Sequence, residues 1–134
     1  MLLYRLYRKL LWVQGTYMVL TALWGLLDIH SFMVVTGPKT DVWLVKTVSV
    51  LILCLSILFF SNLAVHSHPL PVVLTGMSAS AGLAFIDFYY TLNETIRWVY
   101  AVDGGVEAGF FCLWAYLYFR KQQWIKDFTQ GKRL

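Results

Sequence analysis

Four stretches of mostly apolar residues fill this chain, and each has about the 20 residues that an α-helix needs to cross a bilayer. A backbone inside lipid must satisfy its own hydrogen bonds, so only helices or a closed barrel can span it, and the alternating pattern of barrel strands is missing. The sequence therefore predicts an all-α, integral membrane four-helix bundle. Its spans are expected at residues 10–27, 42–63, 70–92 and 96–119.

The composition agrees with a single transmembrane domain over residues 1–134. Hydrophobic residues make up 59% of the chain and charged residues 13%, whereas a soluble domain usually carries about 25% charged residues. The net charge of +4 does not indicate nucleic-acid binding, because eight of the 11 lysines and arginines lie in the two tails. That distribution follows the positive-inside rule and predicts that both termini are cytoplasmic, with the basic C-terminal tail 120–134 near membrane lipids.

Each predicted span carries a stripe of polar or small residues on one face, as the helical period requires. Such stripes favour a common interior, although small residues alone also allow helices simply to pack closely. The stripes, in chain order, are Gln14, Tyr17, Thr21 and Asp28; Lys46, Ser49, Leu53 and Ser56; Gly76, Ser80, Ala84, Asp87 and Thr91; Tyr100, Asp103, Glu107, Phe111 and Trp114.

Four ionisable residues, Lys46, Asp87, Asp103 and Glu107, lie inside the predicted spans, and Asp28 ends the first span. A charge in the membrane is costly and usually marks a functional interior site. The acids outnumber the lysine, so we expect that an acid is protonated, that a cation occupies the site, or that water enters. Glu107 is the deepest acid and is our candidate for the protonated one.

Lys46 lies near the N-terminal end of its span, where the helix dipole disfavours a cation. We therefore expect Asp87 or Asp103 to pair with it. The alternative interpretation of the whole cluster is a set of salt bridges between helices that only stabilises the fold.

The outer segment 28–41 is too long for a tight turn, and Gly37-Pro38 marks a break in it. Its apolar part, residues 29–35, is expected either to lie along the membrane surface or to fold back over the mouth of the bundle.

The leading functional hypothesis is a polar pocket in the outer half of the bundle that binds a lipid-soluble or cationic ligand. Its expected ligand-binding residues are Lys46, Asp87, Asp103, Glu107, Asp28, Tyr100 and Trp114, with Tyr89 as a further lining residue. We expect no cofactor, and no metal site, because His30 lies at the outer end whereas His66 and His68 lie in the cytoplasmic loop.

Three alternatives stay open. The protein could be a membrane enzyme that acts on a lipid or polyprenoid, with Glu107, Asp103 and Asp87 as candidate catalytic residues and a protonated carboxyl as general acid. It could be an accessory subunit of a larger membrane complex. It could also be a proton- or cation-coupled transporter, which would favour a homodimer because one four-helix bundle leaves little room for alternating access.

Two segments carry a resemblance to known proteins. TGPKTDVWLVKTVSVLIL (residues 36–53) and VYAVDGGVEAG (residues 99–109) resemble small four-span bacterial membrane proteins of uncharacterised activity. This resemblance implies four spans in the bacterial inner (plasma) membrane and implies no activity. In architecture alone, the chain is similar to the emopamil-binding and sigma-2 receptor superfamily, whose members are small helical bundles with acidic residues in a lipid-facing pocket.

Overall fold

The computed structural model describes residues 2–65, 68–121 and 125, and the regular structure in this part of the chain is entirely helical. The helices are α1 (Leu2–Leu27), α2 (Ile29–Thr36), α3 (Val42–Ala64), α4 (Leu70–Leu92) and α5 (Val99–Phe119). The predicted all-α fold is confirmed. Most of the basic tail predicted at 120–134 lies outside the described residues.

Three of the helices, α1, α3 and α4, are long and apolar enough to cross a membrane, which indicates a membrane-embedded protein. Helix α5 is not among them in the part of the chain that the structure describes. The predicted spans 42–63 and 70–92 agree with α3 and α4 to within one residue. Helix α1 begins earlier than predicted because its first turns, which carry exposed Arg5, Arg8 and Lys9, are already helical.

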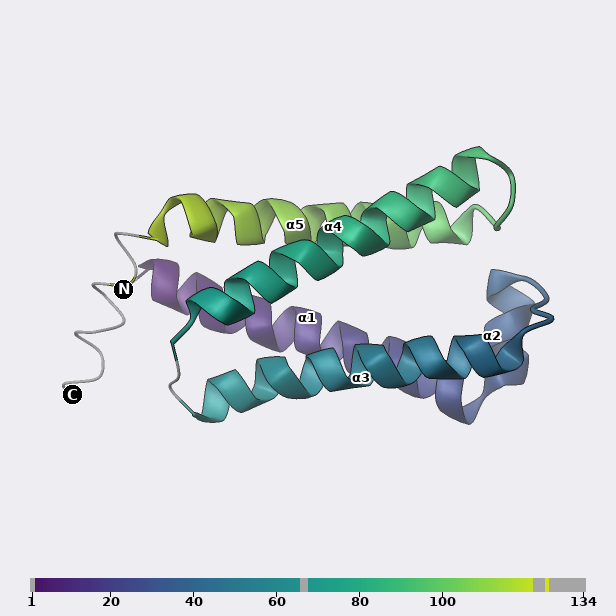
Figure 1. The fold of residues 1–134 in the computed structure, drawn as a ribbon, viewed down its shortest axis with the longest axis horizontal. Helices are drawn as coiled ribbons and strands as arrows, with labels where there is room; N and C mark the ends of the chain where they lie inside the picture. The colour runs from purple at the N-terminus through teal and green to yellow at the C-terminus, as the bar shows by residue number, and fades with distance from the viewer. Residues whose placement is uncertain (1, 66–67, 122–124, 126–134) are drawn as a thin grey trace.

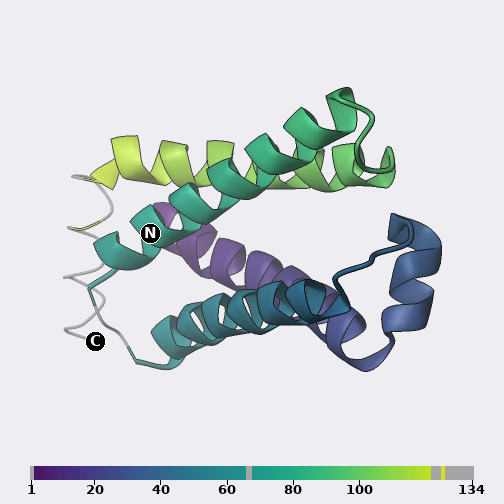
Figure 2. The ribbon, with the colours of Figure 1, turned by 45° about the vertical axis from the view of Figure 1, so that its right-hand side comes forward.

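The four long helices form two antiparallel pairs, α1 with α3 and α4 with α5, and most contacts between helices lie within these pairs. The pairs approach each other at the end where α1 begins and α5 ends, called here the tail end. They diverge toward the opposite end, called the α2 end (Figures 1 and 2). Both views place the first turn of α1 and the last turn of α5 at the tail end.

Glycines let the helices of each pair approach closely. A methyl group at Gly25 of α1 would lie 2.5 Å from Ser49 Oγ of α3, so any larger residue would force that hydroxyl to move. On α4, a methyl group at Gly76 would lie 2.5 Å from the indole ring of Trp114 on α5. The predicted close packing at Gly76 is therefore confirmed, and the indole fills the space that a side chain would need.

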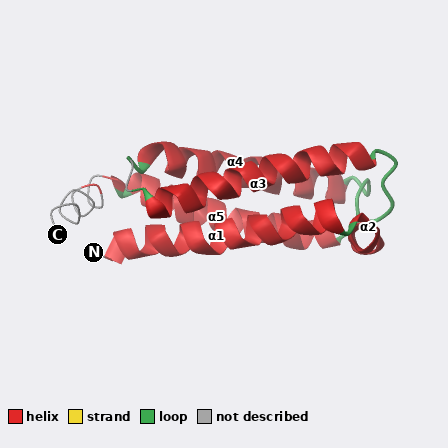
Figure 3. Cartoon of the chain, turned by 90° about the horizontal axis from the view of Figure 1, so that it is seen from below, coloured by secondary structure: helices red, strands yellow, loops and turns green. Residues whose placement is uncertain are grey.

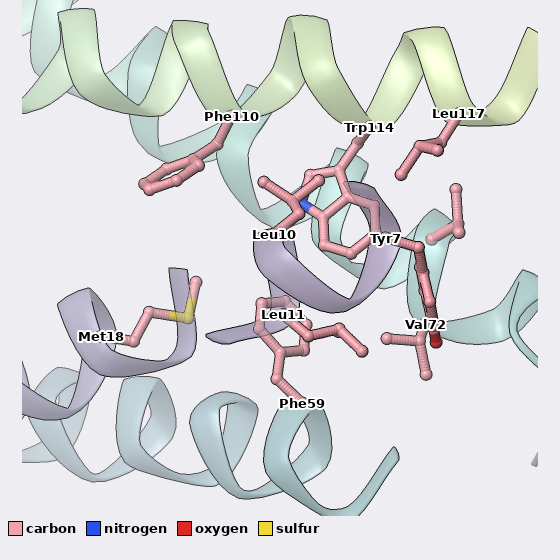
Figure 4. Close-up of a cluster of buried hydrophobic side chains, with 10 residues drawn as sticks. Tyr7, Leu10, Leu11, Met18, Phe59, Val72, Phe110, Trp114 and Leu117 are labelled. Carbon is pink, nitrogen blue, oxygen red and sulfur yellow. The ribbon is translucent and has the colours of Figure 1, made fainter. Parts of the chain in front are cut away.

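A hydrophobic core at the tail end joins the two pairs (Figure 4). Trp114 reaches from α5 toward α1, where its ring meets Tyr7 edge-on, and it also contacts Phe59 of α3. The buried members of the core are Tyr7, Leu10, Leu11, Met18, Phe59, Val72, Val73, Phe110, Trp114 and Leu117. Residues from all four long helices thus fill this end of the bundle.

A buried chain of hydrogen bonds also crosses between the pairs. Trp114 Nε1 donates to Gln14 Oε1 at 2.6 Å, and Gln14 Nε2 donates to Ser80 Oγ at 2.7 Å. Because all three side chains are fully buried, each bond satisfies a polar group that water cannot reach. The bonds connect α5, α1 and α4 and fix how the two pairs are placed relative to each other.

Helix α2 crosses the α2 end of the bundle (Figure 3). It begins after Asp28, whose carboxylate accepts a hydrogen bond from the Ser31 backbone N–H at 3.1 Å. This bond holds the pKa of the exposed Asp28 carboxyl below its usual value. The cap therefore stabilises α2 at neutral pH and is lost as the pH falls through that lowered pKa.

Candidate functional site

A cavity of about 570 Å³ lies between the two helix pairs at the α2 end, where the pairs diverge. All five helices contribute to its wall. Its apolar lining residues are Trp24, Phe32, Val35, Leu44, Val45, Val48, Ile52, Leu83, Ile86, Val99, Val102 and Val106. Its polar lining residues are Tyr17, Thr21, Thr36, Ser49, Asp87, Tyr100 and Asp103. We call this cavity the pocket.

Two carboxyl groups enter the pocket from the α4–α5 pair. Asp87 lies where α4 packs closely on α5, since a methyl group at Gly104 would lie 3.1 Å from the Asp87 Cβ atom. Asp103 precedes that glycine on α5, and its Oδ1 accepts a hydrogen bond from the Tyr17 hydroxyl of α1. This bond connects the two helix pairs at the wall of the pocket.

Asp87 has no comparable donor. The residue is only 7% exposed, and its buried Oδ2 atom has no hydrogen-bond partner within the described part of the chain. An unsatisfied buried polar atom is uncommon in proteins and calls for a specific explanation. Here it belongs to a residue that lines an open cavity and receives no hydrogen bond from the described part of the chain.

Glu107 lies outside the pocket wall, in the buried region toward the tail end. It is 2% exposed, lies next to Ser80, and is close enough to Asp87 and Asp103 to interact with both electrostatically. Its Oε2 atom also lacks a hydrogen-bond partner among the residues described. The three acids of α4 and α5 therefore converge, and two of them, Asp87 and Asp103, line the pocket.

The structure separates other predicted site residues from the pocket. Lys46 is exposed and is not among the residues that line it. The expected pairing of Lys46 with Asp87 or Asp103 is therefore wrong. Asp28 is exposed and caps α2 instead. Tyr100 does line the pocket, whereas Trp114 belongs to the core of the tail end.

Two aromatic residues on the α4–α5 pair also differ from the prediction. Tyr89 is 52% exposed, and its ring stacks on Phe85 along the outer face of α4 rather than lining the pocket. Phe110, not Phe111, continues the buried stripe of α5 between Glu107 and Trp114. The helical period allows either position, and contact with the α1 residue Tyr17 favours Phe110.

Helix α2 covers the pocket and is attached to both helix pairs. On the α1 side, Trp24 Nε1 donates to Ser31 Oγ at 2.8 Å. On the α5 side, Arg97 Nη1 donates to the Val34 carbonyl at 2.8 Å, and the Lys39 ammonium lies 4.9 Å from the centre of the Tyr100 ring. Of the two placements considered for residues 29–35, the fold-back over the mouth of the bundle is confirmed.

Tyr17 and the α2 residues that line the pocket were not among the predicted site residues. Tyr17 stands beside Gln14 on the polar stripe of α1, but the sequence does not show which acid it meets. Phe32 and Val35 are apolar, and an apolar residue in this segment is as compatible with membrane contact as with a pocket wall.

Comparison of the chain with protein-family models, curated proteins and solved structures gave no match. The function is therefore inferred from the pocket. Its volume falls within the range of about 300–1,000 Å³ that is typical of small-molecule sites. Its mostly apolar wall with a few convergent polar groups is also the composition typical of such sites.

Proposed function

We propose that this protein is a four-span protein of the bacterial inner membrane that binds a lipid-soluble or cationic small molecule in the pocket. The observation that carries the proposal is a largely apolar cavity of about 570 Å³ whose wall includes the acidic residues Asp87 and Asp103. An empty cavity of this size would lose many packing contacts, so an occupant would stabilise the bundle.

The fourth span in this proposal is α5. It is similar in length to the other long helices, packs extensively against α4, and buries Glu107, Phe110 and Trp114 against the rest of the bundle. Exposed basic residues at the tail end, such as Arg8 and Arg120, favour a cytoplasmic location for that end. The pocket then opens in the outer half of the membrane.

The structure offers less support for the alternatives. An enzyme that used Glu107 as general acid would need this carboxyl in contact with a substrate, yet Glu107 does not line the pocket. A transporter would need polar access from both sides, yet Leu11, Phe59 and Trp114 fill the tail end. Binding requires only the pocket.

Filling the pocket with a larger side chain is expected to abolish binding. Thr21 lines the pocket, and its hydroxyl donates only to the Tyr17 carbonyl of its own helix. Thr21→Trp therefore adds an indole at the cavity wall without breaking a bond between helices. Two fluorescent probes of matched shape, 9-anthracenemethanol and 9-(aminomethyl)anthracene, can be titrated calorimetrically into protein in lipid nanodiscs, with empty nanodiscs as the blank. We expect Thr21→Trp to weaken binding of the better probe by at least about tenfold.

Thr47→Trp is the matched control, because Thr47 is exposed and makes the same kind of hydrogen bond, to the Trp43 carbonyl of its own helix. This variant is expected to bind like the wild type. The proposal is contradicted if neither probe binds the wild type more tightly than it binds folded Thr21→Trp.

A further inference from the structure

The two carboxyl groups of the pocket differ in how their oxygens are satisfied. Asp103 accepts a hydrogen bond from the Tyr17 hydroxyl, which stabilises an ionised carboxylate. Asp87 is more than nine-tenths buried, lines the pocket, and carries an Oδ2 atom that no described residue donates to. The pocket thus offers one carboxylate held by the protein and a second carboxyl that lacks a partner.

Two other helices place titratable groups around Asp87. Helix α5 contributes Asp103, Tyr100 and, below the pocket wall, Glu107, and α1 contributes Tyr17. The lining residues of α2 and α3 are uncharged. Among the described residues, therefore, no lysine or arginine lines the pocket to balance the acids.

The basic residues at this end of the bundle do not line the pocket. Arg97 donates to the Val34 carbonyl of α2. Lys39 lies over the ring of Tyr100 and also donates to the Thr36 carbonyl, and Lys46 is exposed on α3. A buried carboxylate without a partner costs several kcal/mol, and such a group binds a proton instead. On these grounds Asp87 would carry a proton while the pocket contains no cation.

An ammonium group could take the place of that proton. It would donate charge-assisted hydrogen bonds to both carboxylates, and the rings of Tyr17 and Tyr100 would attract its positive charge. No group of three or more His, Cys, Asp or Glu residues in the described part of the chain is arranged to hold a metal ion, so an organic cation fits the site better. The apolar wall formed by residues such as Trp24, Phe32 and Val48 suits a hydrophobic body attached to the ammonium.

We propose that the occupant is a hydrophobic ammonium compound whose charged nitrogen binds between Asp87 and Asp103, and that its binding releases the Asp87 proton to solution. This inference depends on the proposed function, since it names the ligand class of the same pocket. The exchange is electrically balanced: one positive charge enters the site and one proton leaves it.

The anthracene amine and alcohol probes distinguish the ammonium inference from the proposed binding function. The amine probe is protonated between about pH 5.5 and 7.5, whereas the alcohol probe is neutral, and both carry the same ring system. We expect the amine to bind wild-type protein at least about tenfold more tightly than the alcohol at the higher pH. We expect the Kd of the amine to fall by up to about tenfold for each unit by which the pH rises, with close to one proton released per amine bound. The Kd of the alcohol should not change with pH.

Asp87→Asn should abolish both the pH dependence and the proton release of amine binding. The control is Asp41→Asn, which makes the same acid-to-amide change at an exposed residue before α3. Proton release is measured from the dependence of the binding enthalpy on the ionisation enthalpy of the buffer, and the wild-type result stands even if Asp87→Asn does not fold.

Equal binding of the amine and the alcohol, without pH dependence, would overturn the ammonium inference and leave the proposed binding function in place. Tighter binding of the amine without proton release would also overturn the exchange. Binding of neither probe would contradict the proposed function.

Discussion

Truncation of Trp114 to alanine is expected to lower the free energy of unfolding by about 3–5 kcal/mol, which is typical of a fully buried tryptophan. The indole packs against Tyr7 and Phe59, so the truncation would leave a cavity where the two helix pairs meet. It would also remove the donor to Gln14 Oε1 and leave that buried oxygen unsatisfied. Reversible unfolding in mixed micelles, followed by circular dichroism, measures the change.

Two further variants show whether packing or the hydrogen bond dominates. Trp114→Phe keeps a six-membered aromatic ring but loses the Nε1 donor and the rest of the indole, so we expect it to cost about 1–3 kcal/mol. Trp43→Ala removes a tryptophan that is 67% exposed and should change stability by no more than about 0.5 kcal/mol. Equal costs for Trp114→Ala and Trp43→Ala would contradict the described core.

Gly76→Leu is expected to destabilise the bundle by about 3 kcal/mol or more, because overpacking forces neighbouring groups to move. Even a methyl group at this position would lie 2.5 Å from the Trp114 ring, and the leucine side chain needs still more space. Gly82→Leu on the same helix is the matched control, since a methyl group there meets nothing within 4 Å. The control should unfold like the wild type.

A double variant tests whether the clash is with Trp114 in particular. Removal of the indole by Trp114→Ala frees the space beside position 76, so Gly76→Leu should cost less in that background. We expect a coupling energy of about 1–3 kcal/mol between the two substitutions. Additive costs would mean that the leucine meets a different neighbour.

The helices themselves could be predicted because hydrophobic length and the helical period act locally. Residues 42–63 and 70–92 are mostly apolar over their whole length, and α3 and α4 agree with those limits within one residue. The start of α1 could not be predicted from the apolar run, because Arg5 and Arg8 are polar but compatible with a helix. A hydropathy pattern detects lipid contact, not where a helix begins.

The site was predictable only in part. Asp87, Asp103 and Tyr100 were expected in the pocket and do line it, since a buried acid has few other places in a membrane bundle. Lys46 was expected beside them but is exposed, because a lysine near the end of a helix can extend its long side chain away from the core. The Tyr17 contact with Asp103 depends on how the two helix pairs are placed, which no local pattern specifies.

The central claim is that the pocket holds a specific hydrophobic molecule through its carboxyl groups. The claim concerns occupancy in the native membrane, so it is tested on protein extracted gently from that membrane without added ligand. Asp103→Asn is the informative variant, because it neutralises a pocket acid whose Oδ1 can still accept the Tyr17 hydrogen bond as an amide oxygen. Asp41→Asn again serves as the control.

The measurement is mass spectrometry of the small molecules and lipids that remain bound to the wild type and to these two variants after purification. The account predicts a specific hydrophobic molecule, beyond bulk lipid, in the wild type and in Asp41→Asn, and its loss from folded Asp103→Asn. Bulk lipid alone in all three samples would contradict the account, and would favour acids that serve only to hold the helices together.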